Sequence, residues 1–224
     1  MSLQVITVDG PSGSGKSSVS RGVARALGLR YLDTGATYRA VTWWMLQSAV
    51  DVHDPQAVAA AVEKPHLEVG TDPVTLSVHV DGADVSKAIR SRAVSNSVSA
   101  VSAVPEVRER LVSLQRQIIG DGGVVVEGRD IGTVVAPGAE VKVFLTASAA
   151  TRAERRTRDL ATDPAATIDL THSELARRDR LDSTRSASPL TMAEDAVEID
   201  STSLGLPEAV DAILELARGR TESS

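Results

Sequence analysis

Residues 10–17 read GPSGSGKS, which fits the pattern G-x-x-x-x-G-K-S, and this octapeptide constrains the fold more than any other feature of the chain. The apolar stretch VITVD precedes it and the helix-forming stretch KSSVSRGVARAL overlaps its end. The glycines of such a loop let consecutive backbone N–H groups turn toward a phosphate. A strand, this loop and a helix in succession predict a nucleotide-binding α/β domain.

The loop supplies most of the expected phosphate contacts. We expect nucleotide phosphates to bind residues of the loop and of the first helical turn: Gly10, Pro11, Ser12, Gly13, Ser14, Gly15, Lys16, Ser17 and Ser18. The Lys16 ammonium is predicted to reach the β- and γ-phosphates, and the Ser17 hydroxyl to bind Mg²⁺. The four histidines show no metal-ligand spacing, so oxygen ligands are expected for any metal.

Length and composition exclude several classes of protein. A chain of 224 residues suits one domain with small insertions, and no run of about 18 apolar residues predicts a membrane span. The first 20 residues hold the loop rather than a signal peptide, so a cytoplasmic location with no membrane partner is expected. The absence of cysteine excludes disulfides and thiolate zinc. A formal charge of -6 argues against a nucleic-acid partner.

Short apolar, β-branched runs mark the strands of the predicted sheet. They lie at residues 4–9, 29–33, 124–128, 141–145 and 196–201. Helical stretches separate them, at 16–28, from near 35, over PQAVAAAVEK, and at 91–103, 105–119 and 207–218. This alternation predicts a three-layer α/β fold with a five-stranded parallel sheet. Residues 66–86 instead carry Thr-Asp-Pro and Asp-Gly turns between short strands, which predicts a small antiparallel insertion.

The polar segment GRDIGTVVAPGAE follows the strand at 124–128. We expect it to form a polar loop at the carboxyl end of that strand. Open α/β sheets bind their ligands at this edge. The segment is therefore predicted to contribute to the binding site.

Other nucleotide-loop proteins need motifs that this chain lacks. A GTPase switch requires D-x-x-G and N-K-x-D, and neither occurs; a large motor ATPase requires a longer chain. A phosphotransferase needs cations around two anions. The chain has 20 arginines against 4 lysines, and arginines gather at residues 152–158 and 177–185, on both sides of the polar stretch DLATDPAATIDLTHSE. This arrangement predicts a mobile helical lid that carries arginines.

Five segments together resemble one family. DGPSGSGKSS, YLDTGATYRAVT, VVEGRDIGTVV, KVFLTAS and ARRDRLDSTRSASPL, in this order and spacing, are similar to the bacterial cytidylate kinases among the nucleoside monophosphate kinases. The resemblance covers nearly the whole chain, and the third and fifth segments are its most specific parts. It implies transfer of a phosphoryl group from ATP to CMP, and also to dCMP, with Mg²⁺, in a monomeric cytoplasmic enzyme.

The same resemblance implies roles for individual residues. Positions around the acceptor phosphate are matched by Tyr38, Arg39 and Arg129. Positions of the cytosine pocket are matched by Thr34, Arg108, Asp130 and Arg185. Positions around the pentose are matched by Ser99, Arg178 and Asp182, and lid arginines by Arg155 and Arg156. The implied catalytic set is Lys16, Arg129, Arg155, Arg156 and Arg178.

The resemblance also implies a division of the chain. Residues 1–34, 104–151 and 186–224 would form the core kinase domain. Residues 35–103, with the antiparallel insertion near 66–86, would form the region that binds the nucleoside monophosphate. Residues 152–185 would form the lid.

Simpler interpretations of these residues stay open at this point. Tyr38, Trp43 and Trp44 have spacings that also suit a helix packed in a core. Arg129 and Asp130 could form a structural ion pair. Asp182 and Arg185 could form an i,i+3 pair on the surface of a helix.

Two alternative functions are also open. One is a kinase for another small acceptor, such as UMP or shikimate. The other is a regulatory switch that binds a nucleotide. A switch would release inorganic phosphate slowly, whereas a kinase would form ADP only when its acceptor is present.

Overall fold

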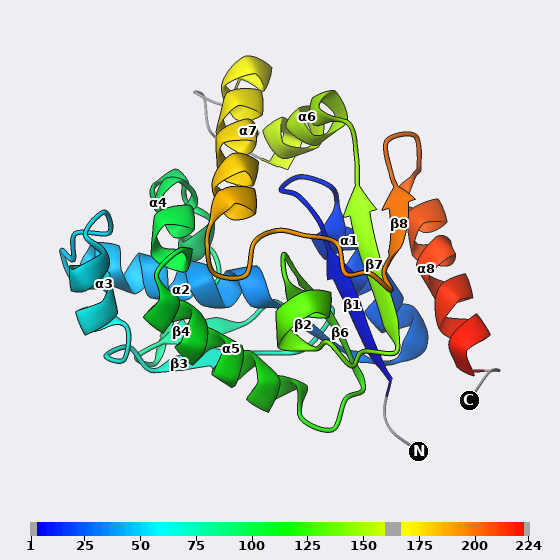
Figure 1. Ribbon diagram of the computed structural model, residues 1–224, viewed down its shortest axis with the longest axis horizontal. Helices are drawn as coiled ribbons and strands as arrows, with labels where there is room; N and C mark the ends of the chain where they lie inside the picture. Colours follow the sequence, from blue (N-terminus) through cyan, green and yellow to red (C-terminus); the bar gives the residue numbers. More distant parts are fainter. Residues whose placement is uncertain (1–3, 160–166, 222–224) are drawn as a thin grey trace.

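The computed structural model describes residues 4–159 and 167–221 (Figure 1). Its centre is a five-stranded sheet in the order β2-β6-β1-β7-β8, in which all neighbouring strands are parallel. The strands are β1 (Val5–Asp9), β2 (Arg30–Asp33), β6 (Val124–Gly128), β7 (Val141–Thr146) and β8 (Val197–Asp200). The predicted five-stranded parallel sheet is confirmed.

Helices cover both faces of this sheet, because its central strands are apolar on both sides. Val125 of β6 packs into one cluster with α1 (Lys16–Leu27) and α8 (Leu206–Thr221). Val124 and Val126 point to the opposite face and pack with α5 (Pro105–Ile119). Because successive side chains of β6 point into two different clusters, the sheet lies between two layers of helices, which gives the predicted three layers.

A second group of elements lies between β2 and α5 in the chain. It contains α2 (Thr34–Gln47), α3 (Pro55–Ala61), β3 (Leu67–Val69), β4 (Val78–Val80), β5 (Ala83–Asp84), η1 (Ala88–Arg90) and α4 (Arg92–Ser102). The strands β3, β4 and β5 pair antiparallel in that order, which confirms the predicted insertion. All of these elements except β5, which is exposed, contribute to a separate hydrophobic cluster.

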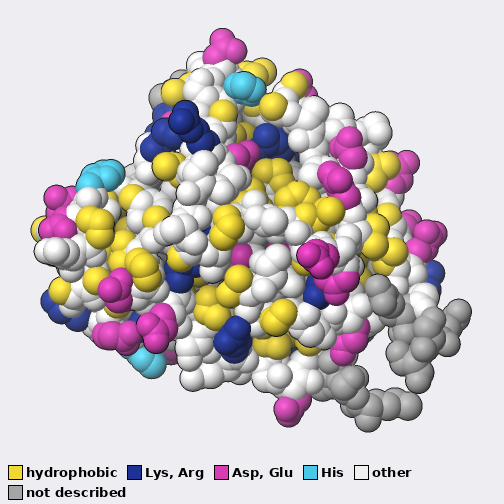
Figure 2. Space-filling model, in the orientation of Figure 1, with side chains coloured by type: hydrophobic (Ala, Val, Ile, Leu, Met, Phe, Trp, Pro, Cys, Tyr) yellow, Lys and Arg dark blue, Asp and Glu magenta, His cyan; other side chains and the backbone are white. Residues whose placement is uncertain are grey.

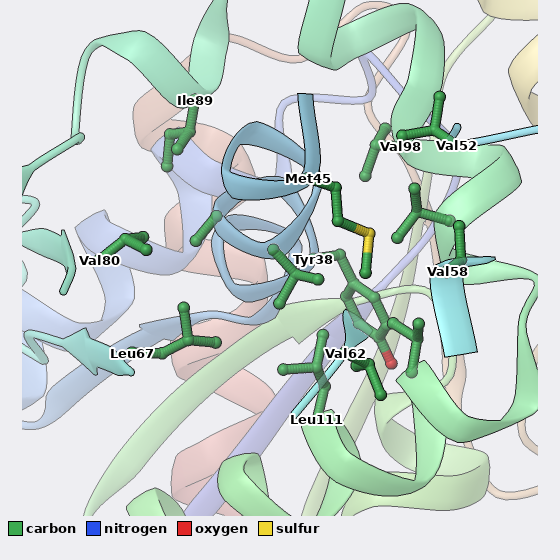
Figure 3. Packing of buried hydrophobic residues seen from close by; sticks show 14 of the residues in the cluster. Tyr38, Met45, Val52, Val58, Val62, Leu67, Val80, Ile89, Val98 and Leu111 are labelled. Carbon is green, nitrogen blue, oxygen red and sulfur yellow. The ribbon is translucent and has the colours of Figure 1, made fainter. Parts of the chain in front are cut away.

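Tyr38 and Met45, both on α2, point toward each other in this cluster (Figure 3). Trp43 and Trp44 pack against its edge, and the indole N–H of Trp44 donates to Asp81 at 2.8 Å. The two tryptophans are therefore packing residues, as their spacing indicated. Tyr38 is also a core residue, but it has a second environment that is described below.

The helices α6 (Ala149–Asp159) and α7 (Ile168–Thr184) stand at the end of the sheet toward which β7 and β8 point (Figure 1). On the face shown in Figure 2, Lys and Arg side chains lie on both sides of α7, and Asp and Glu are spread over other parts. The polar stretch expected between two helical runs includes residues 160–166, which lie outside the described residues, whereas Ile168–Glu174 belong to α7, so that part of the expectation was wrong. Within the described ranges no helix is long and apolar enough to cross a membrane.

One local expectation was wrong. The segment after β6, expected to be a polar loop, contains the π-helical turn η2 (Ile131–Val135). Ile131, Gly132 and Val135 are buried, and Ile131 and Val135 pack into the cluster under α5. The apolar side chains of this segment pack against a hydrophobic surface. Their burial favours a compact helical turn over an exposed polar loop.

The neighbouring strand β7 requires a glycine at position 10. Its φ is +146°, and a Cβ atom at this position would lie 2.1 Å from the carbonyl oxygen of Leu145 in β7. No side chain fits at that distance. The chain can leave β1 toward the phosphate loop along this path because residue 10 is glycine.

We expect Gly10→Ala to lower the free energy of unfolding by about 2 kcal/mol or more, because it adds backbone strain and a clash with β7. Urea unfolding measures this change. The control is Gly138→Ala, since a Cβ at Gly138 meets no atom within 4 Å, and a change within about 0.5 kcal/mol is expected there. Equal stabilities for the two variants would contradict the close approach.

Candidate active site

A cleft of about 530 Å³ lies between the phosphate loop, α2, α4, α6 and α7. Most of the residues predicted for the site line it, although they come from distant parts of the chain. They are Ser12, Gly13, Ser14, Gly15, Lys16, Ser17, Ser18, Thr34, Tyr38, Arg39, Ser99, Arg108, Arg129, Asp130, Arg155, Arg156, Arg178, Asp182 and Arg185. Gly10 and Pro11 lie outside this lining, at the base of the loop.

Glycines give the backbone of the loop its sharp turns. Gly13 and Gly15 have φ values of +79° and +91°, a region that glycine occupies without strain. Lys16 is buried at the start of α1, and its Nζ donates to the carbonyl oxygen of Pro11 at 2.6 Å. Burial, together with the charge of Arg129, lowers the pKa of Lys16 to about 7. A bound phosphate would favour its ammonium form.

Asp9 lies directly under the loop and was not predicted as a functional residue. Its carboxylate accepts hydrogen bonds from the N–H groups of Ile131 at 2.9 Å and Gly132 at 2.8 Å. Burial nevertheless raises the pKa of Asp9 to about 6, against the opposing effect of these bonds. Asp9 therefore anchors η2 to the end of β1 at an electrostatic cost.

Two further carboxylates were missed by sequence reasoning. Glu127 and Asp33 are aligned neighbours on β6 and β2, at the carboxyl edge of the sheet, and both line the cleft. Glu127 accepts a hydrogen bond from the Tyr31 hydroxyl, and burial, followed by the charge of Asp33, raises the pKa of Glu127. Asp33 caps α2 and pairs with Arg90 at 3.0 Å. Their position at two strand ends was the signal that could have identified them.

Half-buried arginines form the opposite side of the cleft. Arg39 donates to the carbonyl oxygen of Ile89 at 3.0 Å and to Ser95 Oγ at 2.9 Å. Burial lowers the pKa of Arg39, and the charges of Arg178 and Arg156 lower it further. Burial and Arg129 lower the pKa of Arg178 to about 10. Among the described residues Arg178 Nε has no hydrogen-bond partner. Such a cluster suits a dianion, which would offset its repulsion.

Tyr38, Arg108, Asp130 and Arg185 form a second buried group. Arg108 donates to Asp130, and its guanidinium lies over the Tyr38 ring, 5.3 Å from the ring centroid. Arg185 Nη2 lies 3.7 Å from Asp130 on the other side. This group offers a carboxylate acceptor beside guanidinium donors, a pattern that can distinguish planar bases.

Arg129 and Asp182 connect the two sides of the cleft. Arg129 Nε donates to Asp182 at 3.2 Å and Arg129 Nη2 donates to Ser12 Oγ at 2.6 Å. Ser99 Oγ donates to the other oxygen of Asp182 at 3.2 Å. Arg129 thus pairs with Asp182 rather than with Asp130, so a structural Arg129–Asp130 pair is the wrong interpretation. A surface pair of Asp182 with Arg185 is wrong too, because both side chains are buried.

Two predicted residues donate hydrogen bonds to backbone carbonyls. Arg155 donates to the carbonyl oxygens of Ser14 at 3.2 Å and Ser201 at 2.7 Å, so it joins the loop to the segment after β8. Thr34 Oγ1 donates to the carbonyl oxygen of Glu127 at 2.7 Å. Both line the cleft while they hold neighbouring backbone in place. Ser201, which also bonds Arg155 through its hydroxyl at 3.0 Å, was not predicted.

A phosphate loop that faces a cluster of arginines across one cleft is typical of an α/β kinase that binds two anionic substrates. The family model described as cytidylate kinase matches residues 6–219. The chain therefore belongs to the cytidylate kinase family, and it is a nucleoside monophosphate kinase.

Curated relatives agree with this assignment. The cytidylate kinase of Streptomyces coelicolor is 53% identical over 214 residues, which cover 95% of this chain and 91% of the relative. That of Streptomyces avermitilis is 50% identical over 214 residues, with the same coverage of 95% and 91%. A solved structure of an uncharacterized protein from Eubacterium ventriosum has a TM-score of 0.52 at 10% identity, covers 97% of this chain and 99% of that one, and shows the fold alone.

The raised pKa of Asp9 gives a prediction for stability. The folded-state pKa, about 6, exceeds the ordinary value of 3.8, so the contribution of Asp9 to stability is complete below pH 3.8 and is lost as the pH rises through 6. An asparagine at this position does not ionise, so the stability of Asp9→Asn does not decrease for this reason as the pH rises. Its free energy of unfolding, relative to wild type, should therefore increase by about 2–3 kcal/mol between pH 4 and pH 7.

Urea unfolding of both proteins at several pH values measures this difference. Asp211→Asn, at an exposed position of α8, is the control and should differ from wild type by a constant amount. A constant difference for Asp9→Asn as well would show that burial does not perturb Asp9.

Proposed function

We propose that this protein transfers the γ-phosphoryl group of ATP to CMP, and also to dCMP. One observation carries the proposal: in a chain of the cytidylate kinase family, the phosphate loop and a cluster of half-buried arginines face the same cleft. The two sides are suited to two different anions. Phosphoryl transfer requires that such anions be held together, away from water.

The donor side would hold ATP through the loop and Lys16. The Ser17 hydroxyl would bind Mg²⁺, with the carboxylate of Glu127 close to Ser17. These oxygen donors fit Mg²⁺, which keeps few protein ligands and binds substrate phosphates. In the described part of the chain no group of three His, Asp or Glu side chains could hold a metal alone. When bound, Mg²⁺ would neutralise the charge of the phosphates.

The acceptor side would hold CMP in three parts. The phosphate would lie against Tyr38, Arg39 and Arg129, and the pentose against Ser99, Arg178 and Asp182. The base would lie against Thr34, Arg108, Asp130 and Arg185. Cytosine carries an amino donor at position 4 and acceptors at N3 and O2, which suits a carboxylate beside two guanidinium groups.

Catalysis in this proposal needs no general base. The acceptor phosphate is already an anion near neutral pH, so positioning and charge neutralisation supply the rate enhancement. Lys16, Arg129, Arg156 and Arg178 would neutralise the charge around the transferred group. Arg155 would hold the loop, since its guanidinium binds the carbonyl of Ser14.

We also propose the division of the chain into three regions that the family resemblance implies. Residues 35–103 would bind the monophosphate, residues 152–185 would act as a lid, and residues 1–34, 104–151 and 186–224 would form the core. A monomeric state and a cytoplasmic location stay predictions from the sequence.

Family membership favours CMP over UMP, shikimate or a switch function. The decisive test is ADP formation from ATP with CMP, dCMP, UMP, AMP and shikimate as separate acceptors. We expect ADP to form with CMP and dCMP, with no free phosphate. Slow phosphate release without any acceptor would instead indicate a nucleotide switch.

Lys16→Ala should reduce kcat by about 100-fold or more while the fold is retained, because this charge stabilises the departing γ-phosphoryl group. Steady-state kinetics with ATP and CMP measure the effect, and circular dichroism checks the fold. Lys142→Ala is the control, since Lys142 pairs with Asp195 away from the cleft. A folded Lys16→Ala protein with nearly normal turnover would contradict the donor site.

Asp130→Ala should lower kcat/KM for CMP far more than for UMP. Uracil presents a carbonyl at position 4 to the same carboxylate, which disfavours it by about 2–4 kcal/mol, or roughly 30- to 1000-fold. Asp130→Asn is the matched variant, because its amide can donate to that carbonyl and should narrow the preference further. Kinetics of both nucleotides with the three proteins measure the ratio.

If Asp130 serves only to hold Arg108 and Arg185, both substrates will suffer alike. An unchanged ratio of kcat/KM values in the two variants would therefore remove the role of Asp130 in recognising the base.

A further inference from the structure

Ser12 of the phosphate loop is bound at all three of its polar atoms. Its N–H donates to Asp179 Oδ1 at 3.0 Å, and its carbonyl oxygen accepts from Arg152 Nη1 at 3.0 Å. Its hydroxyl accepts from Arg129 Nη2 at 2.6 Å. Ser12 is buried. The loop is therefore held at this residue by groups from outside the loop.

Asp179 and Arg152 form a clamp on the Ser12 peptide. They come from α7 and α6 and form an ion pair with each other, with side chains 18% and 14% exposed. A low exposure strengthens such a pair because little water screens it. The backbone of α6 also approaches the loop closely, since a Cβ on Gly13 would lie 2.9 Å from the carbonyl oxygen of Arg152.

The helix that carries Asp179 also carries the residues proposed for the acceptor. Arg178, Asp182 and Arg185 lie on or directly after α7 and line the cleft. Asp182 bonds Arg129, and Arg129 bonds the Ser12 hydroxyl. Two connections therefore run from α7 to Ser12, one direct through Asp179 and one through Asp182 and Arg129.

We propose that Asp179 is a positioning residue that couples binding of the monophosphate to the conformation of the phosphate loop. The inference rests on the proposed function. An acceptor that orders Arg129 and α7 also orders the Ser12 peptide through the clamp. ATP then binds a loop that is already ordered, so each ligand should strengthen the binding of the other.

Isothermal titration calorimetry with CMP and the β,γ-imido analogue of ATP tests this coupling. In wild type we expect bound CMP to tighten binding of the analogue by about fivefold or more. In Asp179→Ala that factor should fall to within about twofold, while the affinity for each ligand alone changes by less than about threefold. Asp179→Asn keeps an oxygen acceptor for the Ser12 N–H and should retain most of the coupling.

Asp211→Ala is the charge-matched control, because Asp211 is exposed on α8, and its coupling should equal that of wild type. If Asp179 acts only through its charge, its removal will change the affinity for the analogue equally with and without CMP, which overturns the proposal. An absence of coupling in wild type also overturns it. A wild-type protein that does not bind CMP would instead contradict the proposed function.

Arg152→Gln provides a second test that does not depend on Asp179→Ala being folded. It removes the other half of the clamp, including the donor to the Ser12 carbonyl. Reduced coupling in this variant supports the proposal, and coupling equal to that of wild type overturns it.

Discussion

The desolvation of arginine governs the architecture around the cleft. Arg39 and Arg178 are half-buried, and desolvation is the largest influence on the pKa of each. A guanidinium removed from water needs hydrogen-bond acceptors to offset that loss. For Arg39 the structure supplies them from two elements, a carbonyl of η1 and a serine of α4. Arg178 instead has the opposite charge of Asp182 nearby, on its own helix α7. The elements around the cleft are thus held in place partly by the cations that they bury.

The central sheet makes this concentration of charge possible. Five parallel strands bring their carboxyl ends to one edge, where the phosphate loop, Glu127 and Asp33 meet. Helices cover the apolar faces of its central strands, and the hydrophobic core forms there rather than at the polar edge. The charged groups at that edge are free to serve binding, even where they are costly, as the raised pKa of Asp9 shows.

Much of the fold was predictable because it depends on local patterns. The β-branched run Val124–Val126 predicts a strand, and the octapeptide GPSGSGKS predicts the phosphate loop. The same patterns could not identify the partner of Arg129, because Asp182 lies on a helix 53 positions away in the chain. The π-helical turn Ile131–Val135 was missed since it forms only against the surface beneath α5. Pairings of this kind depend on tertiary packing, which single-sequence patterns do not contain.

Helix α7 contacts both the phosphate loop and Arg129. The residues Arg178, Asp179 and Asp182 fall on neighbouring turns, a spacing that places them on one side of a helix. Their partners nevertheless differ: Asp179 binds the loop and Asp182 binds Arg129 and Ser99. Because a helix moves largely as a rigid body, a displacement that adjusts one of these contacts adjusts the others. The spacing within α7 therefore connects the proposed acceptor side to the phosphate loop.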